Sequence, residues 1–141
     1  MTVIYHNPEC GTSRNTLRLI EASGTEVVVI EYLDSGWTRA QLLGLFAAAN
    51  LTVREAMRTV RSPAEALGLT DPSVSDDALL EAMVSHPILV NRPIVCSPKG
   101  VRLCRPCERV LELLEHPPPA PFHKENGDLL IDARGKLVQP D

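Results

Sequence analysis

A cysteine between a short strand and a helix constrains the fold of this chain more than any other feature. Residues 2–5, Thr-Val-Ile-Tyr, are β-branched and aromatic, which predicts a strand. After Cys10, Ser13, Leu17 and Ile20 lie on one face of a predicted helix, and Gly24 is typical of a helix end. A strand that leads directly into a helix indicates an α/β unit. Cys10 is therefore expected in the loop where that helix begins.

Cys10 has the surroundings of a reactive thiol. The first N–H groups of a helix lack intrahelical partners and the dipole is positive there, so this position favours a thiolate or a bound oxyanion. A cysteine so placed has a lowered pKa and is nucleophilic. The polar residues after it argue against the alternative, a cysteine that merely packs in the core. We predict Cys10 as the catalytic nucleophile, with substrate-binding residues Gly11, Thr12 and Ser13 and supporting residues Arg14 and Asn15.

The composition is that of an ordinary folded domain. The chain has 141 residues, of which 44% are hydrophobic and 23% charged, enough for a proper core. No apolar run reaches the length of a membrane span, and we expect no signal peptide. Four cysteines without a secretory segment favour a reducing compartment, so we expect free thiols and a cytoplasmic protein. The net charge of −4 argues against nucleic acid or a membrane surface as the main partner.

Apolar runs of strand length divide the chain. The run 26–32 is continuous, which predicts a buried, parallel strand. The runs 88–90, 94–96 and 101–104 also predict strands, and the turn at 97–100 joins the last two as a hairpin.

The middle of the chain has a helical pattern. Three capping boxes predict helix starts, and they pair Thr38 with Gln41, Thr52 with Glu55, and Ser62 with Glu65. A further helix is expected over 76–85, and another after Pro106 that ends at the prolines of 116–121. Residues 129–131 are expected as a short strand or an apolar clasp, and the last residues as loosely held.

These elements predict an α/β fold with a mixed sheet of about four strands and helices on its faces. One domain is expected to cover residues 1–141, with a helical insertion at about 38–86 and an extended C-terminal tail at about 117–141. The pattern alone leaves the strand order open, although the right-handed crossover rule narrows it for the first half.

Three segments together resemble the glutaredoxin-dependent arsenate reductase family. They are 6–15 (HNPECGTSRN), 91–95 (NRPIV) and 102–106 (RLCRP). The first is long and specific, the last is short, and the match weakens in the proline-rich stretch and the tail. The resemblance implies a thioredoxin-like fold with the nucleophile ahead of the first helix and a cis peptide at Arg92-Pro93.

By the same resemblance, the Cys10 thiolate attacks arsenate and expels water, glutathione attacks the adduct, arsenite leaves, and glutaredoxin reduces the mixed disulfide. The matching positions imply Arg58, Arg92 and Arg105 as the oxyanion clamp, His6 near the thiolate, and Pro93 beside it. Arginine suits a tetrahedral oxyanion because its planar fork donates two hydrogen bonds at once. Arsenate, glutathione as co-substrate and glutaredoxin are the expected partners, with no tightly bound cofactor and no metal.

Each of these side chains also has a simpler interpretation. Arg58 shares its predicted helix with Arg54 and Arg61, and only the resemblance distinguishes it. Arg92 lies between two apolar runs, so it must reach a pocket or be buried at a cost in free energy. His6 could instead hydrogen-bond the loop backbone.

Cys104 and Cys107 form a second Cys-x-x-Cys spacing, which could supply an internal resolving thiol. Against this, Cys107 shares a predicted helix face with Val110 and Leu114, and Cys104 ends an apolar strand. We therefore predict that both thiols pack in the core. Two thiols without a second pair of ligands do not complete a zinc site.

Three other functions are alternatives to arsenate reduction of this type. One is a phosphatase-type arsenate reductase or tyrosine phosphatase, but the pattern of that family has an arginine six positions after the cysteine, where this chain has Thr16. An Spx-like regulator that binds RNA polymerase resembles it in fold but has Cys-x-x-Cys at the active site, where the second position here is Ser13. A related thiol reductase with a different substrate stays open as an alternative.

Overall fold

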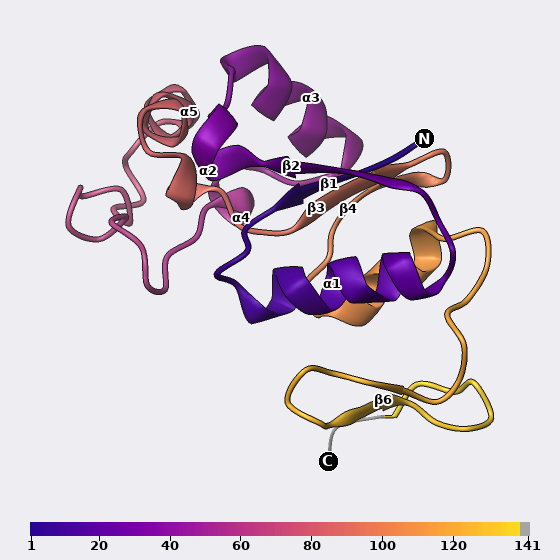
Figure 1. Ribbon diagram of the computed structural model, residues 1–141. Coiled ribbons are helices and arrows are strands. Elements are labelled where there is room, and N and C mark those ends of the chain that lie inside the picture. The colour runs from indigo at the N-terminus through magenta and orange to yellow at the C-terminus, as the bar shows by residue number, and fades with distance from the viewer. Residues whose placement is uncertain (139–141) are drawn as a thin grey trace. The chain divides into compact units, whose positions relative to one another are not determined.

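The structure, a computed structural model, describes residues 1–138 (Figure 1). Its elements follow one another as β1 (Thr2–His6), α1 (Gly11–Ala22), β2 (Val27–Glu31), α2 (Tyr32–Ser35), α3 (Arg39–Ala48), α4 (Val53–Ala56), α5 (Asp76–Ser85), the 3₁₀ helix η1 (Pro87–Leu89), β3 (Ile94–Ser97), β4 (Gly100–Leu103), the 3₁₀ helix η2 (Cys107–Leu113), β5 (Phe122–His123) and β6 (Leu129–Ile131). The end of the segment expected to be loosely held, residues 139–141, lies outside the described residues.

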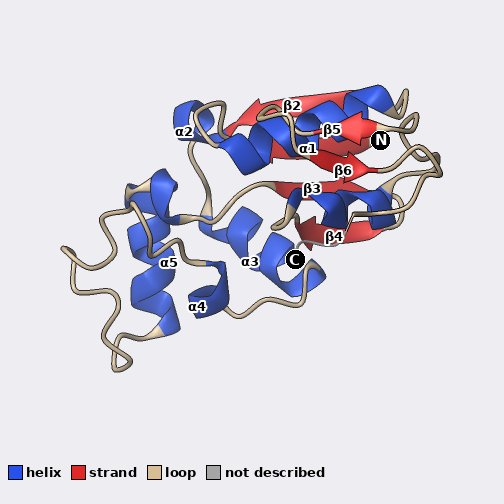
Figure 2. Ribbon diagram, turned by 90° about the horizontal axis from the view of Figure 1, so that it is seen from below, coloured by secondary structure: helices blue, strands red, loops and turns tan. Residues whose placement is uncertain are grey.

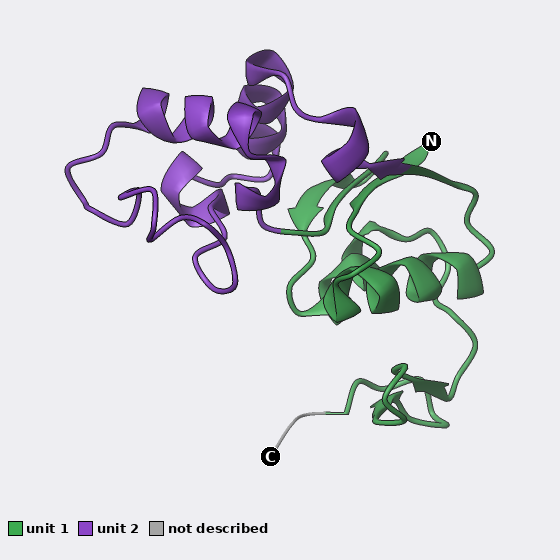
Figure 3. Cartoon of the chain, turned by 60° about the vertical axis from the view of Figure 1, so that its left-hand side comes forward, with its two compact units in different colours: residues 1–29, 92–141 green, residues 30–91 purple. Residues whose placement is uncertain are grey.

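The described chain forms two units (Figure 3). Residues 1–29 and those from 92 onward make the first, here called the sheet unit, and residues 30–91 make the second, the helical unit. The loop that carries Cys10 belongs to the sheet unit. The single domain with a helical insertion at about 38–86 stays a prediction.

The chain contains a four-stranded sheet with the order β2-β1-β3-β4 (Figure 2). Strands β1 and β3 are antiparallel and pair Ile4 with Val95, and β3 and β4 are antiparallel and pair Ile94 with Leu103. The expected mixed sheet of about four strands and the expected hairpin are therefore confirmed.

Helix α1 covers one face of this sheet together with η2, and the space between them is the core of the unit. Ser13, Thr16, Leu19 and Ile20 form its buried face. Gly24 follows the helix with φ +80°, a conformation that favours glycine, so the predicted helix end is confirmed. The buried core side chains are Ile4, Leu19, Ile20, Val95, Cys104, Cys107, Val110, Leu113, Leu114, Phe122, Leu130 and Ile131.

The helical unit begins its helices where the capping chemistry predicts. Thr38 and Thr52 each accept a hydrogen bond from the backbone three residues on, and both capping boxes are complete. Helix α5 spans the predicted residues, with the Ser75 side chain accepting from Ala78 N–H at its start. Leu79, Leu80 and Met83 of this helix are buried.

The prediction of a third capped helix at Ser62 was wrong. The Leu67 N–H donates to Pro63 and the Leu69 N–H to Ala64, but Gly68, with φ +73°, ends this turn before a helix forms. Local hydrogen bonding at Ser62, whose hydroxyl accepts from Ala64 N–H, stabilises a turn instead.

Two other runs differ from the prediction in structure or burial. The run 88–90 is not a strand of the sheet: Pro87 opens a 3₁₀ turn, and only Val90 forms an isolated bridge, with Met57. Strand β2 exists, but it is at an edge of the sheet, and Val28 and Val29 are each 43% exposed. A continuous apolar run does not by itself distinguish an edge strand from a central one.

The helix after Pro106 has the 3₁₀ form rather than the α form. Its buried side chains Cys107, Val110 and Leu113 recur every three residues, which is the 3₁₀ period. After the prolines, β5 and β6 pair as a small hairpin, so the strand interpretation of 129–131 is confirmed (Figure 1). Within residues 1–138, the helices are all too short or too polar to cross a membrane.

Candidate active site

Cys10 is the N-cap residue of α1, and the loop before it is closed by its own hydrogen bonds. The Cys10 N–H donates to the Asn7 carbonyl at 3.0 Å, and the Glu9 N–H donates to Asn7 Oδ1 at 2.9 Å. The Cys10 carbonyl accepts the first helical bond, from Arg14 N–H at 2.9 Å. An Asn-Pro pair favours such a turn because the asparagine side chain bonds the backbone two residues on. Cys10 itself is 9% exposed.

Ser13 joins the strand, the loop and the helix. Its hydroxyl lies 2.6 Å from His6 Nδ1 and accepts from the Asn7 N–H at 3.1 Å, and Ser13 is fully buried. His6 is thereby held beside the first turn of α1 through a side chain. Its position near the thiolate stays a prediction.

The β3–β4 hairpin brings Arg92 and Arg105 together. Because Ile94 pairs with Leu103, the residues just outside this pair, at the open end of the hairpin, face each other. Arg105 Nη1 donates to the Arg92 carbonyl at 3.0 Å and lies 3.6 Å from the sulfur of Cys10. Arg92 is buried, with 7% of its surface exposed. The peptide bond between Arg92 and Pro93 is cis, as the resemblance implied.

The balance of these contacts lowers the pKa of Cys10 below its ordinary value. Burial alone raises this pKa, because the thiolate loses water. The Ser13 backbone N–H and the guanidinium groups of Arg92 and Arg105 donate to the sulfur, and the positive charge of Arg92 adds to them, so that together they outweigh the burial.

The other thiols shift in the opposite direction. Burial raises the pKa of Cys104 to about 12 and also raises the pKa values of Cys96 and Cys107. Cys104 and Cys107 belong to the apolar core of the sheet unit. Their burial supports the prediction that this pair packs in the core.

One protein-family model matches the part of the chain that carries this site. The model described as the ArsC family matches residues 5–113, which include the Cys10 loop, Arg92 and Arg105.

The chain belongs to the ArsC family.

Individual ArsC-family relatives cover almost the whole chain. This chain is 64% identical over 138 residues to the arsenate reductase ArsI2 of Synechocystis, and the match covers 98% of this chain and 99% of the relative. It is 50% identical over 136 residues to an arsenate reductase of Escherichia coli strain K12, covering 96% of each. The solved arsenate reductase from Vibrio cholerae matches with a TM-score of 0.76 and 44% identity, over 80% of this chain and 97% of that one. With the sheet and the helix after Cys10, these matches confirm the thioredoxin-like fold.

Other predicted site residues of this ArsC-family chain contact the backbone or the C-terminal hairpin. The Thr12 carbonyl accepts from the Thr16 hydroxyl at 2.8 Å, and Gly11 begins α1. The Arg14 side chain donates to the Pro8 carbonyl and to Glu125. Asn15 Oδ1 accepts from the backbone N–H of Glu125 and from Arg18 Nη1.

Arg58 belongs to the helical unit, whereas Cys10 belongs to the sheet unit. Arg58 Nε donates to the Val60 carbonyl at 2.8 Å, and its Nη1 lies 3.5 Å from Asn91 Oδ1. Its place in the oxyanion clamp stays a prediction.

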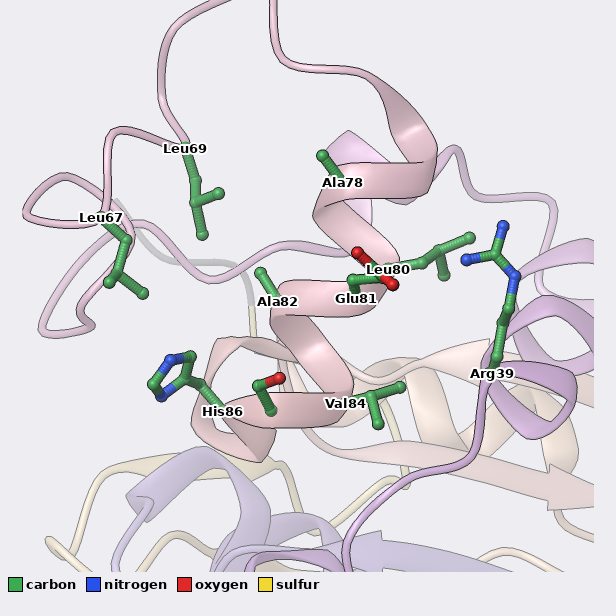
Figure 4. Close-up of a pocket in the computed structure, with 10 residues that line it drawn as sticks. Arg39, Leu67, Leu69, Ala78, Leu80, Glu81, Ala82, Val84 and His86 are labelled. Carbon is green, nitrogen blue, oxygen red and sulfur yellow. The ribbon is translucent and has the colours of Figure 1, made fainter.

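A separate hollow of the ArsC-family chain lies within the helical unit (Figure 4). It is open and is bordered by α5 and by Leu67 and Leu69, with Glu81 and His86 among its polar side chains. Its lining, within the described residues, includes no cysteine and no predicted site residue. The chemistry therefore points to the Cys10 loop rather than to this hollow.

Sequence reasoning missed two residues of the site. Asn7 shapes the loop, and the Asn-Pro pair could have indicated it. Glu125 bonds Arg14 from 111 positions further along the chain, and no local pattern points to it.

Proposed function

We propose that this protein reduces arsenate to arsenite through the thiolate of Cys10. The observation that carries this proposal is the Cys10 sulfur at the start of α1, 3.6 Å from Arg105 Nη1 and with a lowered pKa. A thiolate beside fixed cationic donors is suited to attack an oxyanion, whose own charge would otherwise repel it. The arsenate reductase relatives at 64% and 50% identity support arsenate as that oxyanion.

In the first step, the Cys10 thiolate forms a sulfur–arsenic bond, and one arsenate oxygen leaves as water after protonation. Arg92 and Arg105 would hold the arsenate oxygens with paired N–H donors and stabilise the charge that gathers on them in the transition state. The first N–H groups of α1, at Gly11, Thr12 and Ser13, would add donors at the positive end of the helix dipole.

The second step moves two electrons to arsenic. Attack of the glutathione thiolate on the Cys10 sulfur forms a disulfide and breaks the sulfur–arsenic bond, whose electron pair stays on arsenic as arsenite. A glutaredoxin thiol then attacks the glutathione sulfur and releases the Cys10 thiolate. Both electrons come from thiols, so we propose no tightly bound cofactor, and a cytoplasmic location where glutathione is kept reduced.

Arsenite formation by the purified protein tests this function. With arsenate and glutathione we expect arsenite to form, and we expect glutaredoxin to increase the rate. Phosphate at the same concentration tests whether another tetrahedral oxyanion competes. Absence of arsenite under all of these conditions would contradict the proposal and favour a related thiol reductase or an Spx-like regulator.

A further inference from the structure

The turn between β5 and β6 contacts the first turns of α1 at several points. The N–H at Arg14 Nε is shared between the two carboxylate oxygens of Glu125, which lie 2.9 and 3.2 Å from Nε. The Glu125 backbone N–H donates to Asn15 Oδ1 at 3.0 Å. One turn further along the helix, Arg18 Nη1 donates to the His123 carbonyl at 3.1 Å. These hydrogen bonds therefore hold the C-terminal hairpin against the N-terminal half of α1, which follows the nucleophile.

Arg14 extends this contact to the loop that precedes Cys10. While its Nε is held by Glu125, its Nη1 donates to the Pro8 carbonyl at 2.9 Å. Its Nη2 lies over the first helical turn, 3.7 Å from where a Cβ on Gly11 would be. The guanidinium thus contacts the chain before Cys10 and lies beside the chain after it.

The turn that carries Glu125 is ordered by its own hydrogen bonds. The Lys124 N–H donates to the Asp128 carbonyl at 2.8 Å, and the Gly127 N–H donates to the Lys124 carbonyl at 2.9 Å. The Asp128 N–H donates to Asn126 Oδ1 at 2.9 Å. Gly127 has φ +92°, which other residues rarely adopt. The carboxylate is therefore presented to Arg14 from a fixed backbone.

We propose that Glu125 is a positioning residue for Cys10: its carboxylate fixes the Arg14 guanidinium, and Arg14 holds the Pro8 carbonyl, so that the loop keeps the sulfur under its donors. Arg14 and Glu125 are 42% and 38% exposed, and an ion pair so exposed contributes little to overall stability. The Arg14–Glu125 ion pair acts instead on the geometry of the Cys10 loop. The proposed function enters only through Cys10 as the nucleophile, so a measurement of thiol reactivity and an arsenite assay can fail independently.

The pH dependence of Cys10 alkylation by iodoacetamide, followed by mass spectrometry of the Cys10 peptide, tests this role in Glu125→Ala and Glu125→Gln. Through space, loss of a negative charge would lower the pKa of the thiol, whereas loss of positioning would raise it. We expect Glu125→Ala to raise the alkylation midpoint by about 0.3–0.7 pH units, with alkylation about 2–5-fold slower below it. Glu125→Gln keeps an oxygen acceptor for Arg14 and should restore most of the wild-type profile.

Glu112→Ala is the matched control, because it removes the same charge from an exposed pair, with Arg102 at 3.4 Å. It should leave both the midpoint and arsenate turnover unchanged. A midpoint that falls or stays constant in Glu125→Ala would overturn the proposal, as would an equal rise in Glu112→Ala.

A double-mutant cycle shows whether Glu125 acts through Arg14. In an Arg14→Ala background, Glu125→Ala should produce no further rise of the midpoint; a full additional rise would contradict the proposed route. Should Glu125→Ala not fold, Arg14→Lys provides the same test, since lysine keeps the charge but lacks the fork. An unchanged midpoint in Arg14→Lys would refute the proposal, whatever the arsenite assay shows.

Discussion

Replacing Ser13 by alanine should destabilise the protein more than the loss of one small side-chain group suggests. The hydroxyl bonds His6 Nδ1 at 2.6 Å and the Asn7 N–H at 3.1 Å, and all three residues are buried. A buried polar group that loses its partner costs about 1–3 kcal/mol, so two affected groups predict a loss of about 2–6 kcal/mol in the free energy of unfolding. The Cys10 alkylation midpoint should also rise, because Ser13 orients the loop around the thiol.

Thr16→Val is a matched control, since Thr16 is also a fully buried hydroxyl residue of α1. Its hydroxyl donates to the Thr12 carbonyl at 2.8 Å, and that carbonyl also accepts a helix bond. This variant should therefore lose no more than about 1 kcal/mol. Urea unfolding, with the m-value checked for each variant, measures both losses. A loss in Ser13→Ala no larger than that in Thr16→Val would refute the reasoning.

The remaining expectations concern the thiols and arginines of the site. At neutral pH, iodoacetamide should label Cys10 before the other cysteines, with a midpoint below the reference of about 8.5; an unshifted midpoint would mean that the loop does not stabilise the thiolate. A thiol whose pKa is lowered in the folded protein adds stability at pH values above its ordinary pKa. This added stability is lost as the pH falls through the folded-state pKa, so the stability advantage of wild type over Cys10→Ser should shrink toward acid pH. Arg92→Lys or Arg105→Lys should lower kcat/KM for arsenate about 10-fold or more, because lysine lacks the fork, and full efficiency in both would indicate structural roles. The Cys104→Ser/Cys107→Ala double variant should keep its glutathione- and glutaredoxin-dependent turnover, since burial raises both thiol pKa values; a disulfide from Cys10 to either, after one turnover without glutathione, would contradict this.

The parts of the fold that the sequence predicted well are those with local chemical causes. The capping boxes at Thr38 and Thr52 and the end of α1 at Gly24 depend on hydrogen bonds and backbone angles within a few residues. Ser62 shows the limit, because the same capping pattern occurs in a turn that Gly68 ends. The exposed faces of β2 depend on its edge position, which a residue run does not contain.

The candidate site also combines features with local causes and features that depend on the tertiary fold. The surroundings of Cys10 are encoded in adjacent residues, so the loop at the start of a helix was predictable. The meeting of Arg92 and Arg105 depends on the register of the β3–β4 hairpin, and the family resemblance indicated it where spacing did not. Glu125 reaches the loop only through the tertiary fold, and neither local pattern nor resemblance indicated it.

Arsenite formation by the Cys10→Ser variant, with arsenate, glutathione and glutaredoxin all present, tests the central claim most directly. Serine keeps the size and the hydrogen bonds of the position but does not supply a thiolate. Cys10→Ser should fold as wild type does, by circular dichroism, and form no arsenite above the rate without protein, while wild type turns over repeatedly. Substantial arsenate reduction by a folded Cys10→Ser protein would contradict the account.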